Sequence, residues 1–87
     1  MKRNISGQRI RAARAMYHPP LKQDDLVALL HTKYQIILTK NTLSRIETGN
    51  RYVTDQELVA FAKALHVSTA WLLNETSDPT PNTGTRR

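Results

Sequence analysis

The stretch Thr39–Arg51, TKNTLSRIETGNR, decides how the whole chain is interpreted. Written as a helix, it places Leu43 and Ile46 on one side. Polar and basic side chains fall on the opposite side at helical spacings: Lys40, Asn41, Ser44 and Arg45. A helix that only packs into a core needs the first set alone. The second set suits guanine and adenine edges and phosphate oxygens, so the stretch is predicted to be a recognition helix for the DNA major groove.

The length and composition of the chain limit what it can be. Its 87 residues suffice for one domain. The absence of cysteine excludes disulfides, thiol catalysis and cysteine-ligated zinc, and is compatible with the cytoplasm, where we expect the protein. The N-terminal sequence MKRNISGQRIRAARAM contains no long apolar run, so neither a signal peptide nor a membrane span is expected.

The basic charge is unevenly distributed along the chain. The net charge is +6, yet residues 1–53 carry ten basic residues against three acidic ones, and residues 54–87 carry three against four. A basic half joined to a nearly neutral half indicates that one face meets a polyanion. An excess of Lys and Arg that serves solubility alone is the alternative.

Capping signals predict helices on both sides of the opening stretch. Ser6 is expected to cap a first helix from about Gly7 to Tyr17, which ends before Pro19. A second helix starts near Lys22 or Gln23, with two aspartates in its first turn. Thr39 caps the third helix, whose body is Lys40 to Thr48, and Gly49 is expected to take a positive φ after it.

The C-terminal half predicts two further helices. Thr54 to Glu57 is a capping box that opens the fourth helix, which has the clearest apolar stripe in the chain. Ser68 caps a brief fifth helix that ends near Leu73. The stripe of the fourth helix consists of Leu58, Phe61, Ala62 and Leu65.

The segment TKYQIIL, residues 32–38, is ambiguous between helix and strand. Its β-branched and aromatic residues favour a strand, but no partner run exists elsewhere, and a lone strand cannot satisfy its backbone. We interpret it as a helix end followed by a loop in which Ile36, Ile37 and Leu38 partly close over the core.

Arg14 and Glu47 both occupy helix positions whose periodicity points inward. An isolated buried charge is too costly to keep, so the two opposite charges are expected to meet and tie the first helix to the end of the third. The alternative is that one or both side chains extend to solvent.

Three segments of the chain resemble one family. RIRAAR, LKQDDLVALL and TLSRIETGNRYVTDQELVAFAKALHVSTAWLL are similar to the XRE (Cro/CI-repressor-like) helix-turn-helix proteins, over about residues 7–73. The most specific parts are S-R-I-E-x-G-x-R, T-x-x-E-L and V-S-x-x-W-L. The chain departs from the family pattern in a longer segment over residues 23–39, in Lys22 at the usual hydroxyl cap and in His66 at a common glycine.

The resemblance implies an all-α, compact, five-helix lambda-repressor-like domain whose third helix docks in the major groove. We place this domain at residues 1–74 and expect a disordered tail at residues 75–87, which has no apolar residue to bury. The resemblance also implies a buried Arg14–Glu47 ion pair. It assigns base or nearby contacts to Lys40, Asn41, Thr42, Ser44 and Arg45, and phosphate contacts to Gln23, Thr39, Thr48, Asn50 and Arg51. From its chemistry alone, Arg45 suits a base or a phosphate equally well.

The function expected from these features is a sequence-specific transcriptional regulator, a repressor, of a bacterium or its phage or mobile element. A homodimer on a palindromic operator is expected, with its interface at exposed apolar surface around Trp71, Leu72 and Leu73. The alternatives are an antitoxin or adaptor that holds a small protein partner, and non-specific nucleic-acid binding. No cofactor is expected. The sequence shows no catalytic constellation, and its histidines have no metal-ligand spacing: His18, His31 and His66.

Overall fold

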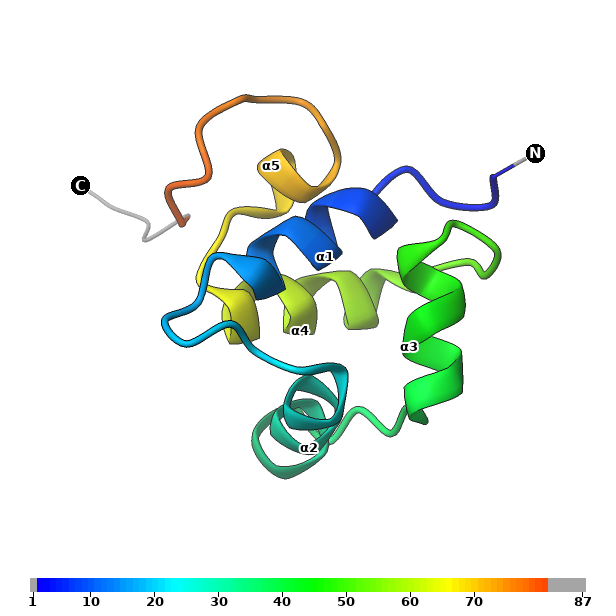
Figure 1. Cartoon of the computed structure of the whole chain (residues 1–87). Helices are drawn as coiled ribbons and strands as arrows, with labels where there is room; N and C mark the ends of the chain where they lie inside the picture. The colour runs from blue at the N-terminus through cyan, green and yellow to red at the C-terminus, as the bar shows by residue number, and fades with distance from the viewer. Residues whose placement is uncertain (1, 82–87) are drawn as a thin grey trace.

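The computed structural model describes residues 2–81, and within that range it contains five α-helices and no strand (Figure 1). The helices are α1 (Gly7–Ala15), α2 (Gln23–Tyr34), α3 (Lys40–Glu47), α4 (Asp55–Leu65) and α5 (Thr69–Leu72). The predicted all-α, five-helix fold is therefore confirmed. No helix of the described range is long and apolar enough to cross a membrane.

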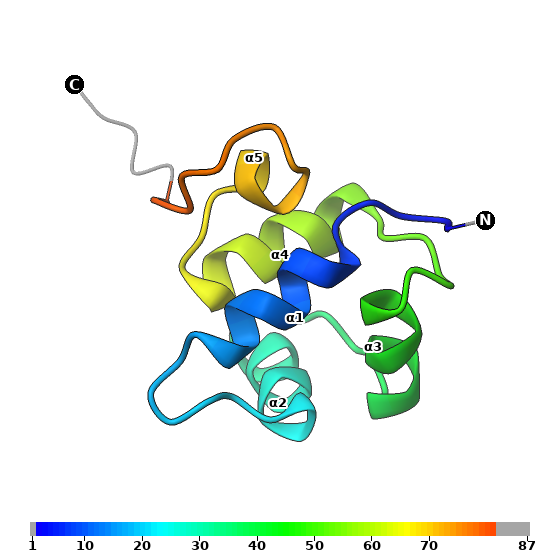
Figure 2. The same ribbon diagram turned by 45° about the horizontal axis from the view of Figure 1, so that its top comes forward.

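The helices pack around α1 and α4, which lie side by side at the centre of the molecule (Figure 1). Helix α2 packs against α3 and α4, and α5 packs against α1 and α4. Helix α3 stands at one edge of the molecule, with the other helices on one side of it, and Figure 2 shows the same arrangement from a second direction. One long face of α3 is therefore left without a neighbouring helix.

A single core receives side chains from every helix. Phe61 of α4 is its largest fully buried side chain, and Phe61, Ala62 and Leu65 of the predicted α4 stripe are buried, whereas Leu58 is only partly so. Other fully buried side chains come from the remaining four helices: Ile10, Leu26, Leu30, Leu43, Ile46 and Leu72. At about 25 cal/mol per Å² of apolar surface, burial of such side chains is the main force that holds the five helices together.

The predicted side-chain caps of α3, α4 and α5 are confirmed. The Oγ atom of Thr39 accepts a hydrogen bond from the Thr42 N–H at 3.0 Å, and Ser68 does the same for Trp71 at 3.0 Å. Thr54 and Glu57 form the complete capping box of α4.

The predicted Ser6 cap of α1 is wrong. Ser6 has nearly helical φ and ψ angles of −95° and −13° and makes no capping hydrogen bond through its side chain. The side chain of Asn4 caps the start of α1 instead, because its Oδ1 atom accepts hydrogen bonds from the N–H groups of Ser6 at 3.0 Å and Gly7 at 2.7 Å. An asparagine that bonds to its own backbone a few residues ahead is a common way to start a turn. Helix α1 also ends at Ala15, two residues before the predicted end.

The connection between α2 and α3 is a helix end and a loop, as predicted, but one of its side chains points the other way. Helix α2 ends in a left-handed residue, Gln35 (φ 55°), and the Ile36 N–H donates to the Leu30 carbonyl at 3.1 Å. Leu38 is buried, while Ile37 is 78% exposed, so its predicted place over the core is wrong. Ile36 packs against the core and Leu38 is buried in it, so Ile37 is the residue of the three that faces solvent.

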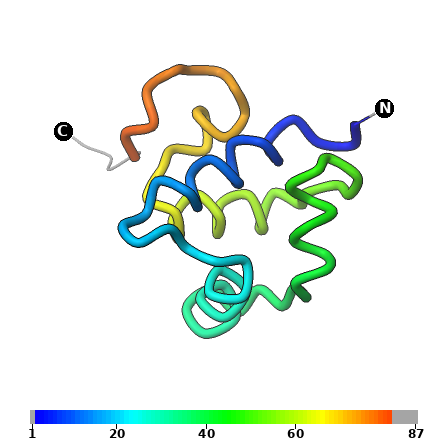
Figure 3. Tube along the Cα trace, viewed as in Figure 1, coloured from blue at the N-terminus to red at the C-terminus, as the bar shows by residue number. Residues whose placement is uncertain are grey.

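The predicted disordered tail, residues 75–87, lies partly outside the described range, since the structure describes nothing beyond Pro81. Residues 75–81 run back along the domain, as the tube in Figure 3 shows. The carbonyl of Thr76 accepts from Arg9 Nη1 at 3.0 Å, and the carbonyl of Pro79 accepts from the Ser68 N–H at 3.2 Å.

The prediction that Trp71 and Leu72 form exposed apolar surface is wrong. Trp71 is only 8% exposed, Leu72 is fully buried, and Leu73 is half-buried. The guanidinium of Arg9 lies 4.6 Å from the centre of the Trp71 ring, and its Nη1 atom donates to the Trp71 carbonyl at 2.9 Å. The end of α5 is therefore packed against α1 rather than open to a second protein.

Candidate nucleic-acid interface

Helix α3 has two faces with different chemistry. Leu43, Ile46 and Glu47 are buried against the rest of the domain. The opposite face carries the predicted contact residues, of which Lys40, Asn41 and Arg45 are exposed, and Thr42 and Ser44 are half-buried. Eight residues at 1.5 Å per residue make a helix about 12 Å long, and an α-helix about 10–12 Å across with its side chains fits a major groove about 12 Å wide. The face left without a helical neighbour is thus a donor-rich surface of suitable length.

The ion pair expected from the sequence fixes the C-terminal end of α3, where Glu47 is the last residue. Arg14 Nε lies 2.8 Å from Glu47 Oε2, and Arg14 Nη2 lies 2.9 Å from Glu47 Oε1. The two side chains are 16% and 4% exposed, so they meet inside the domain rather than extending to solvent. Arg14 Nη1 also donates to the Leu21 carbonyl at 2.9 Å, which ties the loop before α2 to α1.

Gln23 extends this network to the start of α2. Its Nε2 atom donates to Glu47 Oε1 at 3.0 Å, so both carboxylate oxygens of Glu47 are used within the protein. Gln23 is the first residue of α2, where unpaired backbone N–H groups favour an anion. Its second amide hydrogen can donate to a phosphate from the same position, and its phosphate role stays a prediction.

An N-terminal arm, residues 2–5, also holds the C-terminal end of α3, and the sequence analysis did not predict it. The Arg3 N–H donates to the Gly49 carbonyl at 2.7 Å. Asn4 Nδ2 donates to the carbonyls of Ile46 at 3.1 Å and Arg51 at 2.7 Å. The signal available in the sequence was an asparagine just before a helix, a residue type that commonly bonds to nearby backbone.

Gly7 allows the start of α1 to approach the end of α3 closely. A Cβ atom on Gly7 would clash with the Ile46 carbonyl and would lie 2.9 Å from the Glu47 carbonyl oxygen. Any side chain at this position would push the two helices apart. Together with the arm and the ion pair, this contact fixes the orientation of α3.

The hydroxyl and amide side chains at the two ends of α3 are already ordered. Thr39 Oγ1 donates to Thr42 Oγ1 at 2.9 Å. Thr48 Oγ1 donates to the Ser44 carbonyl at 3.1 Å, and Asn50 Nδ2 donates to Thr48 Oγ1 at 3.2 Å. Gly49 has a φ of 85°, as predicted, and the backbone turns there toward the loop. All of these side chains flank the outer face of α3, where the sequence placed base and phosphate contacts.

Lys40 differs from its neighbours in having a charged partner. Its Nζ atom lies 3.9 Å from Asp24 Oδ2, and both side chains are largely exposed. Exposed pairs of this kind contribute about 0–1 kcal/mol, so the lysine can leave the aspartate at little cost.

Arg51 has a structural partner that the sequence reasoning did not foresee. Its Nη1 and Nη2 atoms lie 2.8 Å and 3.2 Å from the carboxylate oxygens of Glu57, and Nη1 also donates to the Tyr52 carbonyl at 2.9 Å. Glu57 is buried and belongs to the α4 capping box. The guanidinium of Arg51 therefore holds the loop between α3 and α4, and a phosphate would have to approach its remaining N–H groups.

The surroundings of Glu57 lower the pKa of its carboxyl. Burial alone would raise this pKa, but hydrogen bonds from Arg51 and Thr54 and the positive charge of Arg51 outweigh it. The ionised carboxylate is therefore the form that the fold stabilises.

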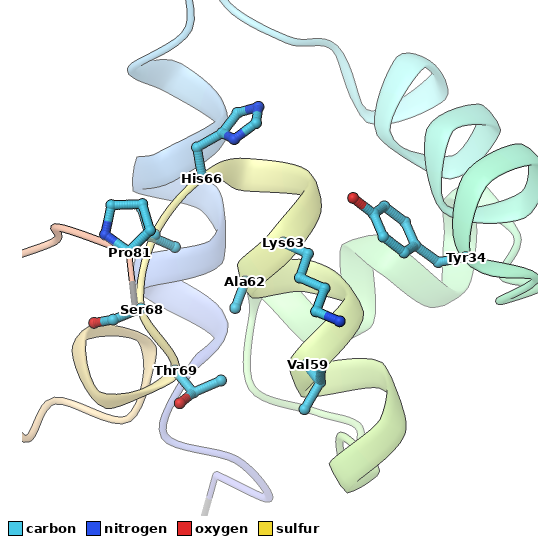
Figure 4. A pocket seen from close by; sticks show the side chains of 9 residues that line it. Tyr34, Val59, Ala62, Lys63, His66, Ser68, Thr69 and Pro81 are labelled. Atoms are coloured by element: carbon cyan, nitrogen blue, oxygen red, sulfur yellow. The ribbon is translucent and has the colours of Figure 1, made fainter. Parts of the chain in front are cut away.

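A separate hollow on another part of the surface is lined by α4, the end of α2, the loop before α5, and Pro81 (Figure 4). Tyr34, Val59 and Lys63 are among its lining residues, and none of them comes from α3. Among the described residues, no group of three or more His, Cys, Asp or Glu side chains could hold a metal ion. The lining of this hollow also includes polar side chains, among them Lys63 and His66, but none of the residues predicted to contact DNA.

Residues 35–72 match the family model described as Helix-turn-helix. This family model describes helix-turn-helix domains of the Cro/C1 (XRE) type. The match covers the approach to α3 and all of α3, α4 and α5. No curated protein matches the chain. Proteins of this type are DNA-binding regulators.

The first prediction concerns the Arg14–Glu47 pair. R14M should lower the free energy of unfolding by about 3–5 kcal/mol, because it leaves the buried Glu47 carboxylate without its cation. The double variant R14M/E47L should recover much of that loss, since it removes both charges. Urea denaturation followed by circular dichroism measures both values. If R14M/E47L lost as much free energy of unfolding as R14M and E47L lose together when measured separately, the pairing would be contradicted.

The second prediction concerns pH and Glu57. Because its folded-state pKa lies below the ordinary value of 4.5, Glu57 adds stability above about pH 4.5. That contribution should disappear as the pH falls through the lowered pKa. E57Q should therefore be less stable than the parent near neutral pH, and the difference should shrink in acid. A difference that stays constant from neutral pH to acid, in chemical denaturation at each pH, would refute this assignment.

Proposed function

We propose that this domain is a sequence-specific DNA-binding transcriptional regulator that reads the major groove with α3 and acts as a repressor. The observation that carries the proposal is the division of α3 between a buried face and a donor-rich face. Leu43, Ile46 and Glu47 hold the helix in place, while no helix packs over its outer face, where the pair of Lys40 with Asp24 of α2 is largely exposed. Repression needs only that the bound protein occupies a promoter, which a domain of this size can do.

The outer face of α3 divides into base and phosphate contacts. Asn41 suits a bidentate pair with adenine, and Lys40 or Arg45 suits the O6 and N7 atoms of guanine. Thr42 and Ser44 suit nearby contacts of either kind. Phosphate contacts set the register of the helix on the duplex, and we assign them to side chains at its flanks: Gln23, Thr39, Thr48, Asn50 and Arg51.

The size of α3 supports a homodimer on a palindromic operator. A helix about 12 Å long covers about four base pairs at 3.4 Å each, a sequence that recurs roughly once in 250 positions. Two copies on two half-sites supply the specificity that one cannot. The expected α5 interface has lost its support, since Trp71 and Leu72 are buried, so the proposal leaves the contact surface between the two copies open.

The alternative role as an antitoxin or adaptor rests on a free C-terminal tail that orders on binding a partner. Residues 75–81 contact the domain through Thr76 and Pro79, so this stretch already has an intramolecular partner. We therefore favour the DNA-binding role.

Selection of bound duplexes from a random pool tests the proposed function. The expected result is an enriched half-site of about four to five base pairs, repeated with inverted symmetry at a spacing of about one helical turn. Recovery of no sequence preference would overturn sequence-specific regulation and leave non-specific binding. A single half-site with a monomeric footprint would overturn the homodimer alone.

The third prediction separates the two roles of Arg45. If Arg45 reads a base, R45A should weaken binding to the selected site by about 1–3 kcal/mol, with a much smaller loss on random DNA. Fluorescence anisotropy with both duplexes measures the two losses. K63A removes one charge from the hollow of Figure 4 and serves as the matched control. An equal loss on both duplexes would assign Arg45 to a phosphate instead.

A further inference from the structure

A second basic surface, which carries Lys2 and Arg11, lies beside the C-terminal end of α3. Two adjoining hollows of about 220 Å³ and 500 Å³ share Lys2, Gln8 and Glu47 among their lining residues. Their walls are the N-terminal arm, the outer face of α1, and the end of α3 with the residues that follow it. None of the contacts assigned under the proposed function uses the arm or α1.

The backbone that carries Lys2 is fixed rather than loose. The next two residues are anchored, because the Arg3 N–H donates to the Gly49 carbonyl and Asn4 Nδ2 donates to the carbonyls of Ile46 and Arg51. The aliphatic part of Lys2 lies over Gly49, where an added Cβ would come within 2.8 Å of Lys2 Cδ. Lys2 is nevertheless exposed, so its ammonium group is presented beside the end of α3.

Helix α1 supplies the other side of this surface. Gln8, Arg11, Ala12 and Ala15 follow one another at helical spacing, line the larger hollow and are all exposed. The two alanines leave room for a bulky backbone to approach, with Arg11 beside them. The acid among the lining residues is Glu47, whose carboxylate oxygens already accept hydrogen bonds from Arg14 and Gln23. The hollow therefore offers the charges of Lys2 and Arg11 without a competing carboxylate.

Thr48 connects this surface to the outer face of α3. It follows Ser44 by four residues, which puts both on one side of the helix end, and it lines the larger hollow together with Lys2 and Arg11. A duplex whose bases lie against Ser44 and Arg45 would carry its backbone along this end of the helix. Lys2 of the arm and Arg11 of α1 line the same hollow as Thr48, so their charges can meet that backbone.

We propose that Lys2 and Arg11 form a second phosphate-binding site, which takes the DNA backbone that flanks the bases contacted by α3. This proposal rests on the proposed function, since it assumes that α3 lies in the major groove. The ligand chemistry is the phosphodiester group, bound by charge and by hydrogen bonds from the ammonium and guanidinium groups. Gln8 lies between the two cations in sequence and lines both hollows, so its amide can donate to a phosphate that either cation binds.

The salt dependence of binding tests the proposal. For the selected duplex, the slope of log K against log salt should become less steep by about 0.9 for K2Q, by the same amount for R11Q, and by about 1.8 for K2Q/R11Q. The loss of affinity should be the same on selected and random duplexes, because phosphates carry no sequence information. K63Q is the matched control, which removes one exposed charge from the hollow of Figure 4 and should leave the slope unchanged.

Phosphate ethylation interference locates the contact. The parent protein should show interference at one or two phosphates outside the α3 half-site, and K2Q/R11Q should lose these while keeping the rest. An unchanged slope for K2Q/R11Q, or a change that K63Q reproduces, would overturn the second site and leave the α3 assignment intact. Failure of the parent protein to bind any duplex would overturn both. Binding of inorganic phosphate to the parent, with no loss of flanking interference in K2Q/R11Q, would show an anion site unrelated to DNA and also overturn the proposal.

Discussion

The buried pair of Arg14 and Glu47 is the constraint on which the arrangement of the domain depends. Neither charge can be left alone inside a core of this size, so α1 and the end of α3 are held at the distance of a bidentate hydrogen bond. Glu47 then accepts from Gln23 as well, which fixes the start of α2 relative to α3. One carboxylate thus sets the position of both α1 and α2 relative to α3.

The other contacts that position α3 are made on its buried face, and no helix packs over its outer face. Leu43 and Ile46 bury apolar surface, and Gly7 lets α1 approach α3 closely. Asn4 donates to the Ile46 carbonyl near the C-terminal end of α3 and to the Arg51 carbonyl in the loop that follows. A helix of eight residues is too short to be stable in water by itself, so its position has to come from such packing. A rigidly held helix keeps its donors oriented before binding and loses less entropy when it enters a groove.

The parts of the fold and site that could be predicted were those set by local chemistry. The caps at Thr39, Thr54 and Ser68 depend on hydrogen bonds within three residues, so the sequence was sufficient to find them. The errors arose where another side chain competes for a role. Ser6 lost its expected role to Asn4, two residues away, and Trp71 is covered by Arg9 from the distant α1. The phosphate contact of Arg51 stays a prediction, and the structure adds a partner that the sequence did not indicate, Glu57.

The sequence by itself determined that the chain forms helices, which side of each faces the core, and which side chains occupy the outer face of α3. These properties follow from helical periodicity, because it places side chains on a face without reference to the rest of the molecule. Only the tertiary structure decided which donors are already engaged, as for Gln23 and Arg51, and which cations lie beside α3, as for Lys2 and Arg11. Those answers depend on how α1, the N-terminal arm and α4 pack against α3, and residues far apart in the chain meet only when the domain has folded.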